Sequence, residues 1–264
     1  MLTFLTLTAA VLYLAATAAF ARPLAHRNPL PHAVGMSLAA IAVFAHAWAL
    51  FGVHRGGVDL HFFAALSLVG ACIAALCVLV NVARPIGTLG VIVFPLAAAL
   101  LLVDVFAAPA TQPLPIEWQI KLHVVFALLG FSVLCVAALF AIFLWLQERA
   151  LRLHRFGGIV AALPPLTLTE SLMFQLIGAG FALLTLALVS GILFVDNLFA
   201  QHLIHKTVLS IAAWLVFGTL LFGRWRYGWR GRRAVRLTLA GMALLLLAYF
   251  GSRFVLELVL KRVP

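Results

Sequence analysis

The side chains most able to do chemistry in this 264-residue sequence are histidines in or beside long apolar segments. His46 and His123 lie within such segments, while His202 and His205 stand at the start of another, directly followed by Lys206. An ionisable group inside a membrane is costly, so each one is a candidate for function until a partner accounts for it. Imidazole is also a common ligand of transition metals. We therefore take these four histidines as candidate site residues.

The composition indicates which elements must position them. Hydrophobic residues make up 66% of the chain and charged residues 9%, with a mean hydropathy of +1.18. A soluble domain carries roughly a quarter charged residues. A bilayer core about 30 Å thick needs about 20 apolar residues per helix. Eight such segments fit, so we predict an all-α fold, a polytopic bundle of eight transmembrane helices. Residues 1–264 are expected to form one integral membrane domain.

Apolar runs and helix-breaking residues between them set the expected helix positions. The first helix should be retained, because no positive charge precedes it although Ala19-Phe20-Ala21 resembles a signal-peptidase site. Thr167 and Glu170 match a helix-capping pattern, which explains Glu170 as a cap at the start of the sixth span. The expected spans are about 2–21, 32–51, 61–83, 87–106, 117–146 and 167–195, with two more within 202–257.

Arginine positions predict the orientation of the chain. The linkers after the first, third, fifth and seventh spans hold eleven arginines, whereas those after the second, fourth and sixth hold only Arg55. Positive loops stay on the cytoplasmic side, so both termini should lie outside. The net charge of +11 is therefore explained by the lipid bilayer as partner, and no nucleic acid is expected. Asp104 is expected to be a solvated cap at an outer helix end.

Cysteine chemistry is not indicated. Cys72, Cys77 and Cys135 all lie in apolar runs, and there is neither a C-x-x-C nor a C-x-x-C-H motif. These motifs carry thiol exchange and covalent haem attachment, so both activities are unexpected for this chain.

With this orientation, His46, His123 and His205 share a level in the outer half of the membrane. His123 and His205 come from two different spans, as the axial imidazoles of a haem iron would. Lys206 and Arg253 are cations on the same side that could meet haem propionates. His202-x-x-His205 also places two imidazoles on one helix face, so zinc or copper remains an alternative.

Several segments resemble the cytochrome c assembly membrane-protein family of CcsA, CcmC and HemX relatives, above all its YpjD-like inner-membrane branch. The resemblance covers about residues 35–260. The segments that carry it are His205-Lys206-Thr207, Gly228-Trp229-Arg230-Gly231-Arg232-Arg233, Ala248-Tyr249-Phe250-Gly251-Ser252-Arg253, Lys121-Leu122-His123, Gln147-Glu148-Arg149 and Pro164-Pro165.

The resemblance implies about eight helices and a role in moving or presenting haem b, held non-covalently, at the outer membrane face. His123 matches the position of the family's first haem ligand, and His205 lies near that of the second. The family's tryptophan-rich segment has no counterpart in residues 194–204, which argues against haem-joining synthase activity. Other cytochrome c maturation proteins are the implied partners. The alternatives are a small-molecule or metal transporter, with His46, Asp104 and Arg253 along its path, and a membrane scaffold or regulator of haem supply.

The predicted orientation has a direct test by cysteine labelling in intact cells. Thr111→Cys, in the linker after the fourth span, should react with a membrane-impermeant thiol reagent added outside. Arg232→Cys, in the basic linker after the seventh span, should react only after the cells are opened. The unsubstituted chain supplies the background of its three cysteines. The reverse labelling pattern would invert the predicted orientation.

Overall fold

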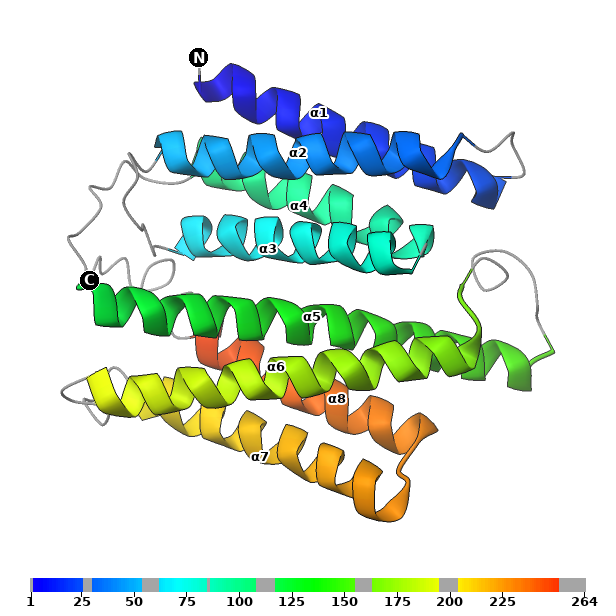
Figure 1. Cartoon of the computed structure of the whole chain (residues 1–264), viewed down its shortest axis with the longest axis vertical. Helices are drawn as coiled ribbons and strands as arrows, with labels where there is room; N and C mark the ends of the chain where they lie inside the picture. The colour runs from blue at the N-terminus through cyan, green and yellow to red at the C-terminus, as the bar shows by residue number, and fades with distance from the viewer. Residues whose placement is uncertain are drawn as a thin grey trace. The chain divides into compact units, whose positions relative to one another are not determined.

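The computed structural model describes residues 2–25, 30–53, 62–84, 86–107, 117–154, 163–194 and 204–251. Within these residues it is helical, and eight helices are long and apolar enough to cross a membrane, which confirms the predicted fold class (Figure 1). The helices are α1 (Leu2–Ala21), α2 (His32–Val53), α3 (Phe62–Ala83), α4 (Gly87–Ala107), α5 (Trp118–Arg152), α6 (Leu166–Phe194), α7 (Ile204–Tyr227) and α8 (Gly231–Leu246).

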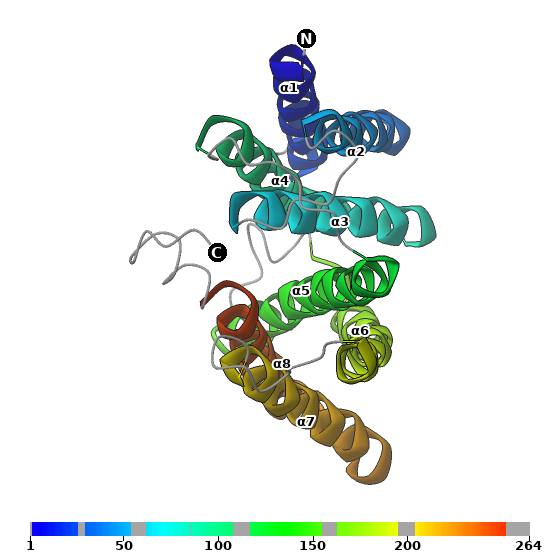
Figure 2. The same ribbon diagram turned by 90° about the vertical axis from the view of Figure 1, so that its left-hand side faces the viewer.

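The chain forms two compact units. Unit 1 consists of Met1–Pro115 and Phe156–Pro164, and unit 2 of Ile116–Arg155 and Pro165–Pro264. In unit 1, α1 packs against α2 and α4, and α3 packs against α4 and α2. In unit 2, α5 packs against α6 and α8, and α7 packs against α8 and α6 (Figure 2). The single integral membrane domain expected from the sequence stays a prediction.

The closest pairing in unit 2 joins α5 and α6, and two glycines make it possible. A Cβ added to Gly180 would come within 2.6 Å of Leu134 Cγ, and one added to Gly130 would come within 3.2 Å of the Leu184 nitrogen. Small residues allow helix backbones to approach closely where lipid offers no hydrophobic drive for association. This close pairing fixes the start of α5 next to the end of α6.

Helix α5 extends beyond its expected end. The apolar run predicted a span to about residue 146, but the helix continues to Arg152 and includes Arg149 and Arg152 in its last turn. Arginines at a helix C-terminus interact favourably with the partial negative charge there. The basic segment expected to follow the span is therefore partly the end of the same helix.

The capping interpretation of Glu170 is wrong. Helix α6 begins at Leu166, and the Glu170 side chain is buried and 3% exposed. Its Oε2 accepts a hydrogen bond of 2.9 Å from Arg230 Nε, and Arg224 Nη1 lies 3.4 Å from its Oε1. A buried carboxylate needs such partners because burial removes its hydration. Glu170 thus ties the end of α7 and the start of α8 to α6.

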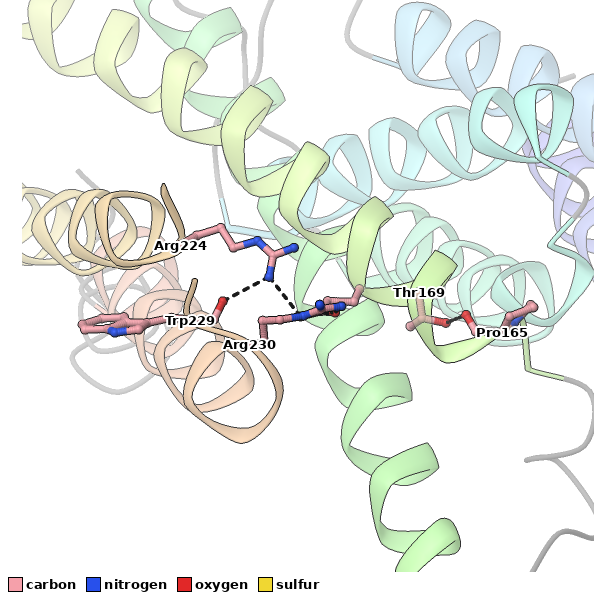
Figure 3. Close-up of polar contacts among 6 residues, drawn as sticks. Pro165, Thr169, Arg224, Trp229 and Arg230 are labelled. Carbon is pink, nitrogen blue, oxygen red and sulfur yellow. Dashed lines mark hydrogen bonds and ion pairs between the residues drawn. The ribbon is translucent and has the colours of Figure 1, made fainter. Parts of the chain in front are cut away.

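The turn between α7 and α8 is shaped by glycines and by Trp229. Gly228 and Gly231 have φ values of 65° and 56°, a region that favours glycine. The Trp229 ring lies directly over Gly223, which has no side chain to displace it. Arg224 Nη1 also donates to the Trp229 carbonyl at 3.4 Å, as Figure 3 shows. The W-R-G-R segment is therefore a fixed turn.

Glu170→Gln should lower the thermal midpoint of the purified protein by roughly 2–8 °C, because it leaves two arginines without their carboxylate. Thr167→Ala is the matched control, since Thr167 is exposed and would matter only if the capping pattern were real. It should leave the midpoint within about 1 °C of wild type. Equal losses from both substitutions would restore the capping interpretation.

Candidate functional site

His123 lies in the second turn of α5 and faces α6. Its Nδ1 is 3.1 Å from Ser190 Oγ, and its ring lies over Gly191. A Cβ added to Gly191 would come within 3.1 Å of His123 Cε1. Because Gly191 has no side chain, the imidazole of His123 can pack directly against α6. The ring is half-buried.

The hydrogen bonds of Ser190 determine which ring nitrogen of His123 carries the proton. Ser190 Oγ donates its one proton to the Ala187 carbonyl at 3.0 Å. It can then only accept from His123, so we infer that Nδ1 carries the hydrogen and Nε2 carries the lone pair. The Ala187 carbonyl also accepts from the His123 ring, and the ring's hydrogen bond to a described side chain is made by Nδ1. In proteins that bind metals, a ligand histidine commonly has its other ring nitrogen fixed by a neighbouring group.

His205 and Lys206 lie in the first turn of α7, in the same unit as His123. His205 is exposed and Lys206 is half-buried. No hydrogen bond or ion pair joins His205 to another described side chain, and no direct contact joins the imidazoles of His123 and His205 within the described residues. Unit 2 thus offers two imidazoles from separate helices.

Aromatic side chains pack around the same helices. Phe131 on α5 lies 5.5 Å from Phe250 and 4.9 Å from Tyr249, between ring centroids. Both partners belong to Leu247–Gly251, a π-helical turn that continues α8. On α7, Trp214 stacks on Phe181 at 5.3 Å between ring centroids and donates a hydrogen bond of 2.9 Å to Thr185. Phe131 and Phe250 are therefore brought together, whereas Trp214 packs on α6.

His46 lies in unit 1 and has a different environment. It is fully buried, with Nδ1 3.2 Å from the Tyr13 hydroxyl and Nε2 3.1 Å from Ser67 Oγ. The three side chains belong to α2, α1 and α3. Since both ring nitrogens are hydrogen-bonded, iron binding by His46 would require one of these bonds to break. Its cofactor role stays a prediction.

Asp104 is not the solvated cap expected from the sequence. Its side chain on α4 is 3% exposed, and it acts electrostatically on His46. The expectation failed because the position near a helix end suggested access to water, whereas the neighbouring helices cover it. A buried carboxylate is costly. Unit 1 therefore encloses a polar group to which all four of its helices contribute.

Two predicted site residues, His202 and Arg253, lie outside the described residues. The zinc or copper alternative built on His202 and His205 is therefore untested. Within the ranges that the structure describes, no group of three or more His, Cys, Asp or Glu side chains is arranged to hold a metal ion.

The sequence missed the residues that position the histidines: Ser190, Gly191, Tyr13 and Ser67. In the sequence, these are small or hydroxyl-bearing residues within apolar runs. Any transmembrane span contains such residues, so the sequence does not distinguish them. Ser190 is 67 positions after His123, so only the packing of α5 on α6 brings them together.

Comparison with known proteins identifies the family of the chain. The sequence model described as "Cytochrome C assembly protein" matches residues 30–260, nearly all of this chain. The chain belongs to the cytochrome c assembly protein family. The match includes all six predicted site residues. No solved structure matches the chain.

Three curated members of the family illustrate the range of similarity. Inner membrane protein YpjD of Escherichia coli is 41% identical over 137 residues, 52% of each chain. An uncharacterised 28.8 kDa protein of Azospirillum brasilense is 37% identical over 171 residues, 61% of this chain and 63% of its own. Cytochrome c biogenesis protein CcsA of Guillardia theta is 25% identical over 165 residues, 56% and 54% respectively. The matched residues thus span about half to two thirds of these relatives.

Tyr13→Phe and Ser67→Ala should each lower the free energy of unfolding by about 1 kcal/mol, because each removes one hydrogen bond of a buried imidazole. Thermal unfolding in detergent measures the change. Thr17→Ala is the matched control, because the Thr17 hydroxyl donates a hydrogen bond to the Tyr13 carbonyl within the same helix and not to His46. The double variant should cost less than the sum of the two single ones, because both bonds depend on one tautomer of His46. Strict additivity would show that the bonds are independent.

Proposed function

We propose that this protein binds haem b non-covalently and presents it at the outer face of a bacterial inner membrane during cytochrome c assembly. The observation that carries the proposal is the hydrogen bond between His123 and Ser190, which leaves the lone pair of Nε2 available. Family membership supports haem as the ligand, because cytochrome c assembly requires it. The outer location rests on the arginine pattern of the sequence.

In this proposal His123, through Nε2, and His205 would hold the haem iron. Ser190 and Ala187 hold the His123 ring in one tautomer, and Gly191 leaves room for the ring against α6. Because His205 is exposed at the first turn of α7, it can reach a haem from the solvent side. The haem, when bound, supplies an iron centre that two neutral imidazoles stabilise.

Cations complete the proposed site. Lys206 follows His205 in the same turn, so it suits a propionate at the membrane surface. Arg253 would bind the second propionate. His46 and His202 remain secondary candidates for cofactor binding. Phe131 and Phe250, whose rings meet edge to face, offer an apolar surface on α5 and α8.

The proposed role is haem handling without haem-joining chemistry. The tryptophan-rich segment that CcsA and CcmC proteins place before the second histidine is missing from residues 194–204. Without it, the chain lacks the aromatic surface that the resemblance assigns to contact with haem. Handing haem to other maturation proteins, or regulating its supply, is the function that fits these residues.

Titration of the purified protein with haemin should give a b-type absorption spectrum with one haem per chain. His123→Ala and His205→Ala should each weaken binding or change the spectrum to that of a singly ligated haem. His154→Ala is the control, because His154 lies in the exposed turn after α5. A protein that takes up no haemin, or variants that bind it like wild type, would contradict the proposed ligands.

Ser190→Ala should lower haem affinity by roughly 10–100-fold, because the hydrogen bond that fixes the His123 tautomer is lost. Ser132→Ala is the control, since Ser132 is also buried between helices but its hydroxyl has no hydrogen-bond partner among the described residues. Equal affinity in both variants would show that Ser190 does not position the ligand.

A further inference from the structure

The turn between α7 and α8 holds more positive charge than the neighbouring carboxylates neutralise. Glu170 on α6 pairs with Arg224 and Arg230, and Glu148 on α5 acts electrostatically on Arg232. Three further exposed arginines have no ion pair with a carboxylate in the described part of unit 2. These three are Arg226, Arg233 and Arg236.

Two of these arginines are held by a pair of stacked aromatic rings. Tyr227 and Trp229 stack with centroids 6.2 Å apart and planes at 23°. The guanidinium of Arg226 lies 5.6 Å from the Tyr227 centroid, and that of Arg233 lies 4.8 Å from the Trp229 centroid. A guanidinium held over a ring face keeps the N–H groups at its edge available. The turn therefore presents two preorganised sets of donors.

The depth of this turn follows from its exposed aromatic residues. Trp225 is 81% exposed, Tyr227 65% and Phe222 54%, and Phe222 contacts both of the others. Large aromatic side chains at the end of a transmembrane helix favour the level of the lipid headgroups. The arginines therefore lie where lipid phosphates lie.

We propose that Arg226 and Arg233 bind the phosphate groups of anionic phospholipids, with the Tyr227–Trp229 pair as their support. Phosphate oxygens accept paired hydrogen bonds from guanidinium groups. No carboxylate in the described part of unit 2 pairs with these two arginines, and their positive charge favours a headgroup without its own cation. The exposed aromatics beside them suit a ligand with acyl chains. This site is independent of any haem site and goes beyond the proposed function.

Native mass spectrometry of the full-length protein in a neutral detergent tests this proposal. Phosphatidylglycerol, phosphatidylcholine with the same acyl chains, and inorganic phosphate are the three probes. The test variant is Arg226→Gln with Arg233→Gln. The matched control is Arg149→Gln with Arg152→Gln, which removes the same charge from the exposed end of α5, where Arg149 lies 5.4 Å from the Trp145 centroid.

The wild type should bind phosphatidylglycerol at least about tenfold more tightly than phosphatidylcholine. The Arg226/Arg233 variant should lose about tenfold or more of this affinity, and the Arg149/Arg152 variant less than about threefold. If the double variant unfolds, each single variant should still lose about threefold. If both double variants lost the same affinity for phosphatidylglycerol, general surface charge would explain the binding and the proposed site would be wrong. Equal binding of both lipids, or binding of inorganic phosphate as tight as that of the lipid, would also overturn it.

Discussion

The structure depends on one constraint: a polar side chain among apolar helices needs a partner from a neighbouring helix. Glu170 on α6 is paired with two arginines from the end of α7 and the turn before α8. These ion pairs hold the turn against α6. His46 meets the constraint with hydroxyls from α1 and α3. His123 meets it with Ser190 of α6. In each case the same contact that satisfies the side chain also fixes how the helices pack.

His46 and His123 differ in which ring nitrogens their hydrogen bonds use. Both nitrogens of His46 are used, so its network stabilises unit 1 and holds α1, α2 and α3 together. His123 bonds Ser190 through Nδ1, and Ser190 can only accept from it because its own proton goes to Ala187. We infer that Nε2 keeps its lone pair. A ligand histidine requires a free lone pair and a fixed ring. This difference, rather than depth in the membrane, favours His123 as the ligand.

Much of the fold followed from the sequence, because the length of an apolar run decides whether a helix can span a bilayer. Eight spans were predicted, and their bounds differ from the structure by a few residues at most ends. What failed depended on contacts between distant residues. Glu170 matched a local capping pattern, but its partners stand 54 and 60 positions later. Asp104 looked like a helix-end cap, and only the packing of unit 1 buries it. Residue type and the family resemblance identified His123 and His205 as candidate haem ligands. The role of Ser190 in positioning His123 is visible only in the structure.

We infer that the protein holds His123 with Nδ1 protonated and Nε2 unprotonated before any haem binds. The nitrogen NMR spectrum of protein with ¹⁵N-labelled histidine, with the His123 signals assigned by their loss in His123→Gln, measures this directly. We predict a protonated Nδ1 and an unprotonated Nε2 for His123 in the wild type, and a mixture of tautomers in Ser190→Ala. A proton on Nε2 in the wild type would contradict the account, because the lone pair would then face Ser190 and the nitrogen left for iron would be blocked.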